Sequence, residues 1–341
     1  MGRSAHREAM EHSERALEAL AHLPETRENI EHAIDVRLDL RSTMLVIAES
    51  SRFLTYLSEA ETLAQSLNDR SRLGWVCASM MVYLWRVADN ERALEYGRRA
   101  AAIASEIGDH GLRAVLNAYL GGVFHALGDY RSPLEGLSET VRSLQGDLLQ
   151  ERFRQWALPS VISRTWLAWC LAELGQLSEA VAVGEEGIRI AETAGHRGTT
   201  AYSTWGAGYA YLCRGDFNQA ISVLERGLEL AEGGLELRVA FNLVGSPLAR
   251  AYSFLGRHSE GLSLHERSIR EAQSLGALYW NSLFVAWQGE SLLLAERLEE
   301  AGECARRSLG LAHERKERGN EAWALRLLGE IASCAERSDG E

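Results

Sequence analysis

The feature that most constrains this chain is a small residue that recurs about every 40 positions. The steps between its six occurrences are 47, 40, 41, 40 and 40 residues. The occurrences are Gly121, Ala168, Gly208, Ala249, Gly289 and Gly329. Periods of about 20–50 residues are typical of solenoids, in which each unit packs on its neighbours. The repetition therefore predicts a stacked array and overrides the two globular domains that a length of 341 residues would suggest.

A second, mostly small residue follows twelve positions after each of the first five. These partners are Pro133, Ala180, Ala220, Gly261 and Ala301. A glycine inside a helix costs about 0.5–1 kcal/mol relative to alanine, so its repeated use at one register needs a structural reason. We interpret the pattern as close approach of two antiparallel helices, A and B, joined by short turns such as G-D-Y, G-Q-L and G-D-F.

The composition agrees with an all-helical chain. Only four prolines occur, and alanine, leucine, glutamate and arginine, which favour helix, dominate. One of the prolines, Pro247, lies inside a predicted helix. Because proline removes a backbone hydrogen bond there, we expect the helix to kink or to restart after Gly245.

The small-residue spacing and the residues around it resemble the tetratricopeptide repeat (TPR). The accompanying residues are Leu120, Leu167, Leu248 and Leu328 before the small position, and Phe124, Tyr211 and Tyr252 after it. The resemblance implies an all-α, right-handed superhelical solenoid of antiparallel helix pairs, with helix A lining the concave face. The period of 40 departs from the usual TPR period of about 34. HEAT-like repeats share the longer period and stay an alternative, although they lack the small-residue pairing.

Extending the register predicts one solenoid domain over residues 1–341, with turns at Ala48 and Ala88. Its predicted units are a helix-B half-repeat at 5–20, repeats at about 26–68, 70–107, 110–146, 155–195, 197–233, 236–275 and 277–315, and a helix-A half-repeat at 317–335. Half-repeats at both ends are expected either of capping units or of a piece of a larger protein.

Longer strings resemble a narrower group, the C-terminal repeat regions of bacterial multidomain signalling proteins that carry an adenylate/guanylate cyclase domain and an ATPase module. The strings are ALGDYR (126–131), LPSVISRTWLAWCLAELG (158–175), GEEGIRIAE (184–192) and HERKERGNEAWALRLLGEIA (313–332). An insertion of seven residues around RFRQWALPS also looks like that family. The resemblance implies a regulatory or docking role, with fused cyclase or ATPase domains as candidate partners. It does not imply cyclase activity, because those modules are not in this chain.

The TPR resemblance also assigns residues of helix A to a concave binding groove. These are Trp75, Trp85, Arg86, His125, Thr165, Trp169, Glu173, Tyr202, Trp205, Tyr209, Arg250, Glu290, Arg326 and Glu330. The predicted groove is aromatic in its middle and charged toward the C-terminal end. Aromatic anchors beside a few polar groups are typical of sites that bind peptides and proteins.

The aromatic residues also have a simpler interpretation, since tryptophan at helical spacing is more often part of the core. Trp166 and Trp169 are three residues apart, and we expect Trp169 in the groove and Trp166 between repeats. For the cluster of Trp169, Tyr202, Trp205 and Tyr209, groove and core stay equally open.

The sequence carries no recognisable catalytic motif. Lys316 is the single lysine, so no P-loop exists, and H-E-x-x-H, G-x-S-x-G and C-x-x-C are absent. We therefore expect no enzyme activity, no metal and no cofactor. The net charge of −12 disfavours nucleic acid as a partner. No apolar stretch approaches the ~20 residues of a membrane span, and we expect a cytoplasmic protein without membrane contact.

These observations predict a scaffold that binds a protein or peptide in its groove, as a regulatory module of a larger bacterial signalling protein. The alternative is a solenoid that senses a small-molecule effector and regulates a fused domain. Self-association through the unpaired terminal helices is a third expectation.

Overall fold

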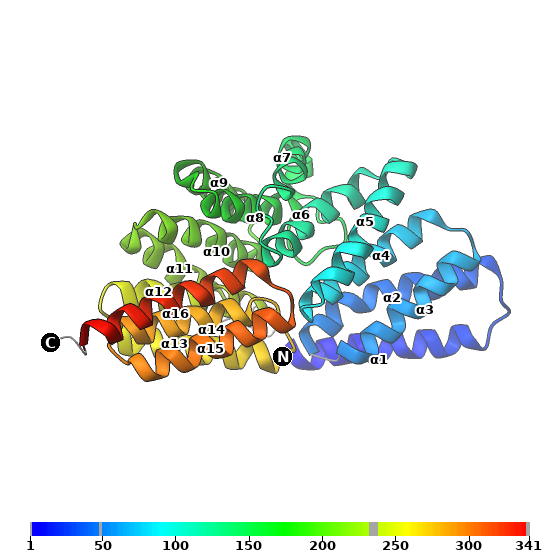
Figure 1. Cartoon of the computed structure of the whole chain (residues 1–341). Coiled ribbons are helices and arrows are strands. Elements are labelled where there is room, and N and C mark those ends of the chain that lie inside the picture. Colours follow the sequence, from blue (N-terminus) through cyan, green and yellow to red (C-terminus); the bar gives the residue numbers. More distant parts are fainter. Residues whose placement is uncertain (1, 48–49, 232–237, 339–341) are drawn as a thin grey trace.

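The computed structural model describes residues 2–47, 50–231 and 238–338, and these residues form helices without any strand (Figure 1). The predicted all-α fold class is confirmed. The helices are α1 Gly2–Ala21, α2 Arg27–Ile47, α3 Ser50–Ser66, α4 Arg70–Arg86, α5 Asn90–Ile107, α6 His110–Ala126, α7 Pro133–Ser143, the 3₁₀ helix η1 Gly146–Gln150, α8 Pro159–Glu173, α9 Leu177–Thr193, α10 Arg197–Arg214, α11 Phe217–Ala231, α12 Arg238–Phe254, α13 His258–Ser274, α14 Asn281–Leu294, α15 Leu298–Glu314 and α16 Arg318–Ser338. None of the described helices is long and apolar enough to cross a membrane.

Consecutive helices pack as antiparallel pairs because short links force the chain to turn back. Between α5 and α6, Gly108 adopts the left-handed conformation at φ 68° and Asp109 caps the next helix. Asp109 Oδ1 accepts a hydrogen bond from the N–H of Leu112 at 2.9 Å. The two residues satisfy helix-terminal groups and reverse the chain direction.

The two registers of small residues face each other across the A–B seam. A Cβ on Gly261 of α13 would lie 2.6 Å from the carbonyl oxygen of Ala249 in α12. A Cβ on Gly289 of α14 would lie 3.3 Å from the carbonyl oxygen of Ala301 in α15. The sequence-predicted contacts are thus present, and they explain why the glycines are tolerated inside helices.

The structure contradicts one part of the expectation for Pro247, the restart of its helix. α12 runs without a break from Arg238 to Phe254 with Pro247 inside it, so the predicted restart after Gly245 does not occur. A proline removes one helical hydrogen bond, and here the buried neighbours Val244 and Leu248 hold the helix in place. The expected turn at Ala48 and the boundary between repeats at 233–236 lie outside the described residues. The division of the chain into a single domain of repeats stays a prediction.

The link between α13 and α14 is longer than the links between α5 and α6, α9 and α10, and α15 and α16. The sequence register starts this repeat at 277, but α14 begins at Asn281 and residues 275–280 form an irregular stretch. Trp280 has a positive φ of 56°, which is rare for a bulky residue. The first turn of this helix A is therefore unwound.

The solenoid closes on itself after five repeats. The N–H of Leu278, before α14, donates to the carbonyl oxygen of Arg86 at the end of α4 at 2.9 Å. A Cβ on Gly128, after α6, would lie 2.9 Å from the backbone nitrogen of Gly319 in α16. The chain forms an arc in which α16, drawn in red, returns to α6 (Figure 1).

Ion pairs across the closure are exposed and contribute little. Lys316 Nζ lies 2.5 Å from Glu91 Oε2, and both side chains are 62% exposed. Such surface pairs stabilise by about 0–1 kcal/mol. Closure therefore depends on the buried contacts of the inner face.

The seam predicts opposite effects for two glycine-to-alanine substitutions. Gly261→Ala should lower the free energy of unfolding by about 1–3 kcal/mol, because its methyl group meets a backbone oxygen. Gly310→Ala in α15 is the matched control, since nothing lies within 4 Å of that Cβ, and it should raise stability by about 0.5–1 kcal/mol. Chemical denaturation of both variants measures the difference, and equal effects would contradict the seam.

Candidate binding face

The inner faces of the A helices meet in a cluster of aromatic rings, here named the aromatic core. It contains Trp85 of α4, Trp166 and Trp169 of α8, Trp205 of α10, and Trp280, which precedes α14. The ring centroid of Trp280 lies 5.2 Å from Trp85, 5.1 Å from Trp166 and 4.7 Å from Trp205. Residues from three helices and from the link before α14, far apart in the sequence, are thus packed together.

The structure places the predicted groove aromatics inside this packed region. Trp169, Trp205 and Tyr209 are 0% exposed, and Trp85 and Tyr202 are 6% and 4% exposed. Their contact with a partner stays a prediction, and it requires the inner face to open. Each buried ring contributes a large apolar area, so opening costs free energy that a partner must offset.

Trp166 and Trp169 do not separate into two environments. Their centroids are 6.1 Å apart, and both rings contact Trp205 and Trp280. Trp166 is buried, and it lies beside Gly121 and Gly122 of α6. Trp169 is equally buried, and its place in a binding groove stays a prediction.

A row of polar residues borders the aromatic core near the C-terminal ends of the A helices. Its first members are Glu173 of α8 and Tyr209 of α10, and His125 of α6 lies beside them. Tyr209 donates its hydroxyl proton to Glu173 Oε1 at 2.6 Å, and His125 Nε2 lies 3.3 Å from the same oxygen. Burial opposes ionisation of Glu173, but the bonds to His125 and Tyr209 outweigh it and lower its pKa.

The row continues along α12, α14 and α16 as an alternation of charges. Arg250 Nε donates to Glu290 Oε2 at 2.5 Å, and both side chains are less than a tenth exposed. Arg326 lies 2.5 Å from Glu290 Oε1 and 2.5 Å from Glu330 Oε1. Arg326 and Glu330 are 43% and 41% exposed. We name the six residues from Glu173 to Glu330 the polar row: Glu173, Tyr209, Arg250, Glu290, Arg326 and Glu330.

Beyond Tyr209 every member of the row is charged, and the role of the row in binding stays a prediction. Burial opposes ionisation of Glu290, but Arg250 and Arg326 keep its pKa below the ordinary value. The guanidinium of Arg250 also lies over the rings of Trp287 and Trp323, at 5.4 and 4.8 Å from their centroids. Arg326 and Glu330, the more exposed members of the row, lie on α16 and form its accessible end.

Three other predicted residues lie apart from the polar row. Trp75 is half-buried in α4 and is not brought to the aromatic core. Thr165 is buried, and its hydroxyl has no partner among the described residues. Arg86 is buried and donates to the carbonyl oxygen of Leu275. Burial lowers its pKa.

Sequence reasoning missed several residues of the inner face. Tyr279, Trp280 and Trp287 are buried among the predicted aromatics, and Trp323 borders Arg250. The adjacent aromatic pair Tyr279-Trp280 at the expected first turn of a helix A was the available signal. His265 of α13 is also fully buried, with its ring nitrogens 3.3 Å from Ser246 Oγ and 3.1 Å from Ser291 Oγ.

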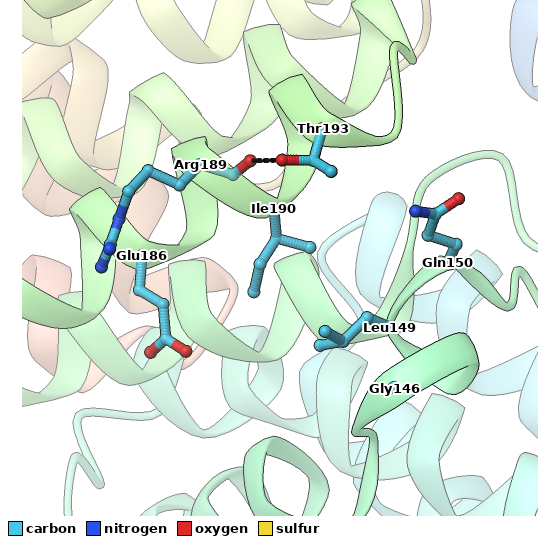
Figure 2. Close-up of a pocket in the computed structure, with 7 residues that line it drawn as sticks. All are labelled: Gly146, Leu149, Gln150, Glu186, Arg189, Ile190 and Thr193. Carbon is cyan, nitrogen blue, oxygen red and sulfur yellow. Dashed lines mark hydrogen bonds between the residues drawn. The ribbon is translucent and has the colours of Figure 1, made fainter.

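A second concave feature lies on the outer surface, where the insertion around residues 144–158 meets α9. The pocket has a volume of about 300 Å³. Figure 2 shows Leu149 and Gln150 near Ile190 and Thr193 of α9. Glu186, at its edge, lies 2.9 Å from the guanidinium of buried Arg164 and is thereby engaged in an ion pair.

The described residues offer little for catalysis. No group of three or more His, Cys, Asp or Glu residues in this part of the chain could hold a metal ion. Burial raises the pKa of Cys77 to about 11 and that of Cys213 to about 12. Thiols with such pKa values are protonated at neutral pH and are poor nucleophiles.

The comparison with known proteins rests on structure. No protein-family model matches the sequence, and no curated protein matches it significantly. A Rap protein complexed with competence and sporulation factor has a TM-score of 0.65 over 98% of this chain and 94% of its own, at 13% identity. The chain has a TPR-like solenoid fold.

Two further structures are less similar. Aspartyl phosphate phosphatase F from Bacillus subtilis has a TM-score of 0.48 at 10% identity, over 88% of this chain and 94% of its own. A signal-transduction ATPase with a TPR sensor from Pyrococcus horikoshii has a TM-score of 0.46 at 13% identity. The match with this ATPase covers 97% of the present chain and 50% of the ATPase chain.

The buried end of the polar row predicts a large loss of stability on removal of one carboxylate. Glu290→Ala leaves Arg250 charged in a dry environment and should lower the free energy of unfolding by about 3–5 kcal/mol. Glu330→Ala, at the exposed end, is the control and should cost less than about 1 kcal/mol. Denaturant titration measures both, and similar losses would show that burial of the pair does not matter.

His265 predicts a loss of stability in acid. Burial and the charge of Arg250 lower its pKa from 6.5 to about 3. The unfolded chain therefore binds the proton more tightly, and stability falls as pH drops from 6.5 toward 3, by up to about 1.4 kcal/mol per pH unit from this group. His265→Gln should flatten that slope, whereas His313→Gln, whose side chain is 80% exposed, should leave it unchanged.

Proposed function

We propose that this chain is a non-enzymatic scaffold that binds a peptide or protein segment at the inner face of its solenoid. The observation that carries the proposal is the polar row, which runs from the largely buried Glu173 to the half-exposed Arg326 and Glu330 of α16. Buried contacts hold one end in place while the other end is accessible. Such an arrangement suits recognition of charged or polar groups on a partner.

The fold supports the same proposal. The Rap protein that is similar over nearly the whole chain was solved in complex with competence and sporulation factor. At 13% identity this likeness concerns the fold, and it makes binding of a partner by a solenoid of this shape a reasonable expectation for this chain.

The proposed cellular setting is a bacterial signalling protein in the cytoplasm, with the solenoid as its regulatory module. The support is the resemblance of strings such as LPSVISRTWLAWCLAELG and HERKERGNEAWALRLLGEIA to the repeat regions of cyclase-ATPase signalling proteins. Fused cyclase or ATPase domains would then be the neighbours that the solenoid regulates.

The test is selection of binders from a random linear peptide library displayed on phage, followed by measurement of affinity for the full chain. The double variant Arg326→Ala/Glu330→Ala should weaken the selected peptides roughly tenfold, because their partner groups lose both charges. The matched control is Arg297→Ala/Glu300→Ala on α15, which removes an ion pair of the same 2.5 Å length and similar exposure.

Two results would overturn the proposal. Peptides that bind both double variants equally would show that the polar row is not the site. Failure to select any peptide, together with a metabolite that raises the melting temperature, would favour the effector-sensing alternative. A ligand at about 100 times its dissociation constant should stabilise the chain by about 2.7 kcal/mol.

A further inference from the structure

The irregular link 275–280 lies against the inner face as a peptide would. The carbonyl oxygen of Arg86 accepts from the backbone N–H of Leu278 at 2.9 Å and from that of Tyr279 at 3.3 Å. The guanidinium of Arg315 donates to the carbonyl oxygen of Leu278 at 2.9 Å. Main-chain groups of the link are thus held from α4 on one side and from the end of α15 on the other.

Two aromatic side chains of the link fill the space between the A helices. Tyr279 stacks on Trp85 with 4.9 Å between centroids and 11° between planes. Trp280 is fully buried against Trp85, Trp166 and Trp205. We name the rings that surround Trp280 the indole cage: Trp85, Trp166, Trp169 and Trp205.

The packing of the link violates two rules that a pure core obeys. Trp280 adopts the left-handed conformation, at φ 56°, which is costly for a bulky side chain. The indole N–H groups of Trp85, Trp169, Trp205 and Trp280 are buried without a hydrogen-bond acceptor in the described chain. Such departures from local consistency are expected at functional sites, where stability is not the quantity that was optimised.

The link is long enough for part of it to extend α14 by one turn. The links 108–109, 194–196 and 315–317 contain two or three residues, whereas 275–280 contains six. α14 has 14 residues, and the A helices α10 and α12 have 18 and 17. Rewinding residues 277–280 onto α14 would give it 18 residues, the length of α10, and would withdraw Trp280 from the cage. A segment with two packings is what a switching element requires.

We propose that the indole cage is a binding site for a polypeptide segment with an aromatic anchor, and that residues 275–280 occupy it as an internal competitor. This inference rests on the proposed function and names its partner class. The partner inserts an aromatic side chain between the tryptophans and offers backbone carbonyls to Arg86 and to the indole N–H groups. A polypeptide fits better than a sugar or a planar metabolite, because Arg86 and Arg315 pair with main-chain groups of the present occupant.

Binding is then a competition between the partner and the link. The apparent dissociation constant rises as the fraction of open molecules falls, so the closed chain binds its partner weakly until the link leaves. Occupation of the cage by the partner and rewinding of the link onto α14 are coupled, and the coupling transmits binding to the α13–α14 region.

The test uses the full wild-type chain and a synthetic peptide with the sequence of residues 274–282, SLGALYWNS. Hydrogen exchange is measured with and without the peptide. Saturating peptide should accelerate exchange of the Leu278 and Tyr279 amides roughly tenfold or more, because their acceptor on Arg86 is lost, while α8 and α10 stay protected. The control peptide carries alanine in place of its tryptophan and should leave exchange unchanged.

A variant strengthens the test. Trp280→Gly removes the internal ring and suits the positive φ, so the variant should bind the peptide roughly tenfold more tightly than wild type. Trp156→Ala, which removes a tryptophan outside the cage, is the control and should keep the wild-type affinity. Free indole at the same concentration should not compete fully, because it lacks the main-chain groups.

The proposal is overturned if the peptide neither alters exchange in wild type nor binds a folded Trp280→Gly variant. If that variant does not fold, native-state exchange of wild type decides the matter. Exchange of Leu278 and Tyr279 through a local opening supports a displaceable link, and exchange through global unfolding alone makes the link part of the core. Neither of these negative results bears on the peptide-library selection, which tests Arg326 and Glu330. The proposed function and this inference can therefore fail separately.

Discussion

Close approach of paired helix backbones is the constraint on which the rest of the structure depends. Small residues at one register allow the carbonyl oxygen of Ala249 to face Gly261, and the same contact recurs between Ala301 and Gly289. A larger side chain at these positions would separate the helices and change the angle between successive repeats. The seam therefore sets how closely the two helices of a pair approach, and these pairs are the units from which the superhelix is built.

The tight winding has a thermodynamic consequence for the inner face. Trp169, Trp205 and Trp280 are completely buried, and their apolar area favours the closed form. Their unpaired indole N–H groups oppose it, since each buried donor without an acceptor costs about 1–3 kcal/mol. Both contributions come from the same rings. The closed face is stabilised by their buried apolar area and destabilised by their indole N–H groups, which lack acceptors in the described chain. A partner that supplies acceptors can satisfy those bonds.

The polar row divides the inner face into parts with different roles. At its buried end, Arg250 and Glu290 form a pair whose desolvation is offset by aromatic rings and by Arg326. At α16, Arg326 and Glu330 are hydrated and lie within reach of a partner. Together with His265, the Arg250–Glu290 pair determines stability and its dependence on pH. The accessible end of the row is where charged groups of a partner can bind.

The sequence alone determined the helical class and the small-residue seam, because these follow from local propensity and from a repeated spacing. Its division of the chain into units of about 40 residues stays a prediction. The sequence also placed Arg250, Glu290 and the pair Arg326 and Glu330 on successive A helices, since the register of the small residues carries over from one repeat to the next. Closure of the solenoid was decided only by the tertiary structure. The winding angle sums small rotations over five repeats, and no local pattern reports that sum. For the same reason the sequence did not place Trp280 beside Trp85, 195 positions away, or show that its helix begins one turn late.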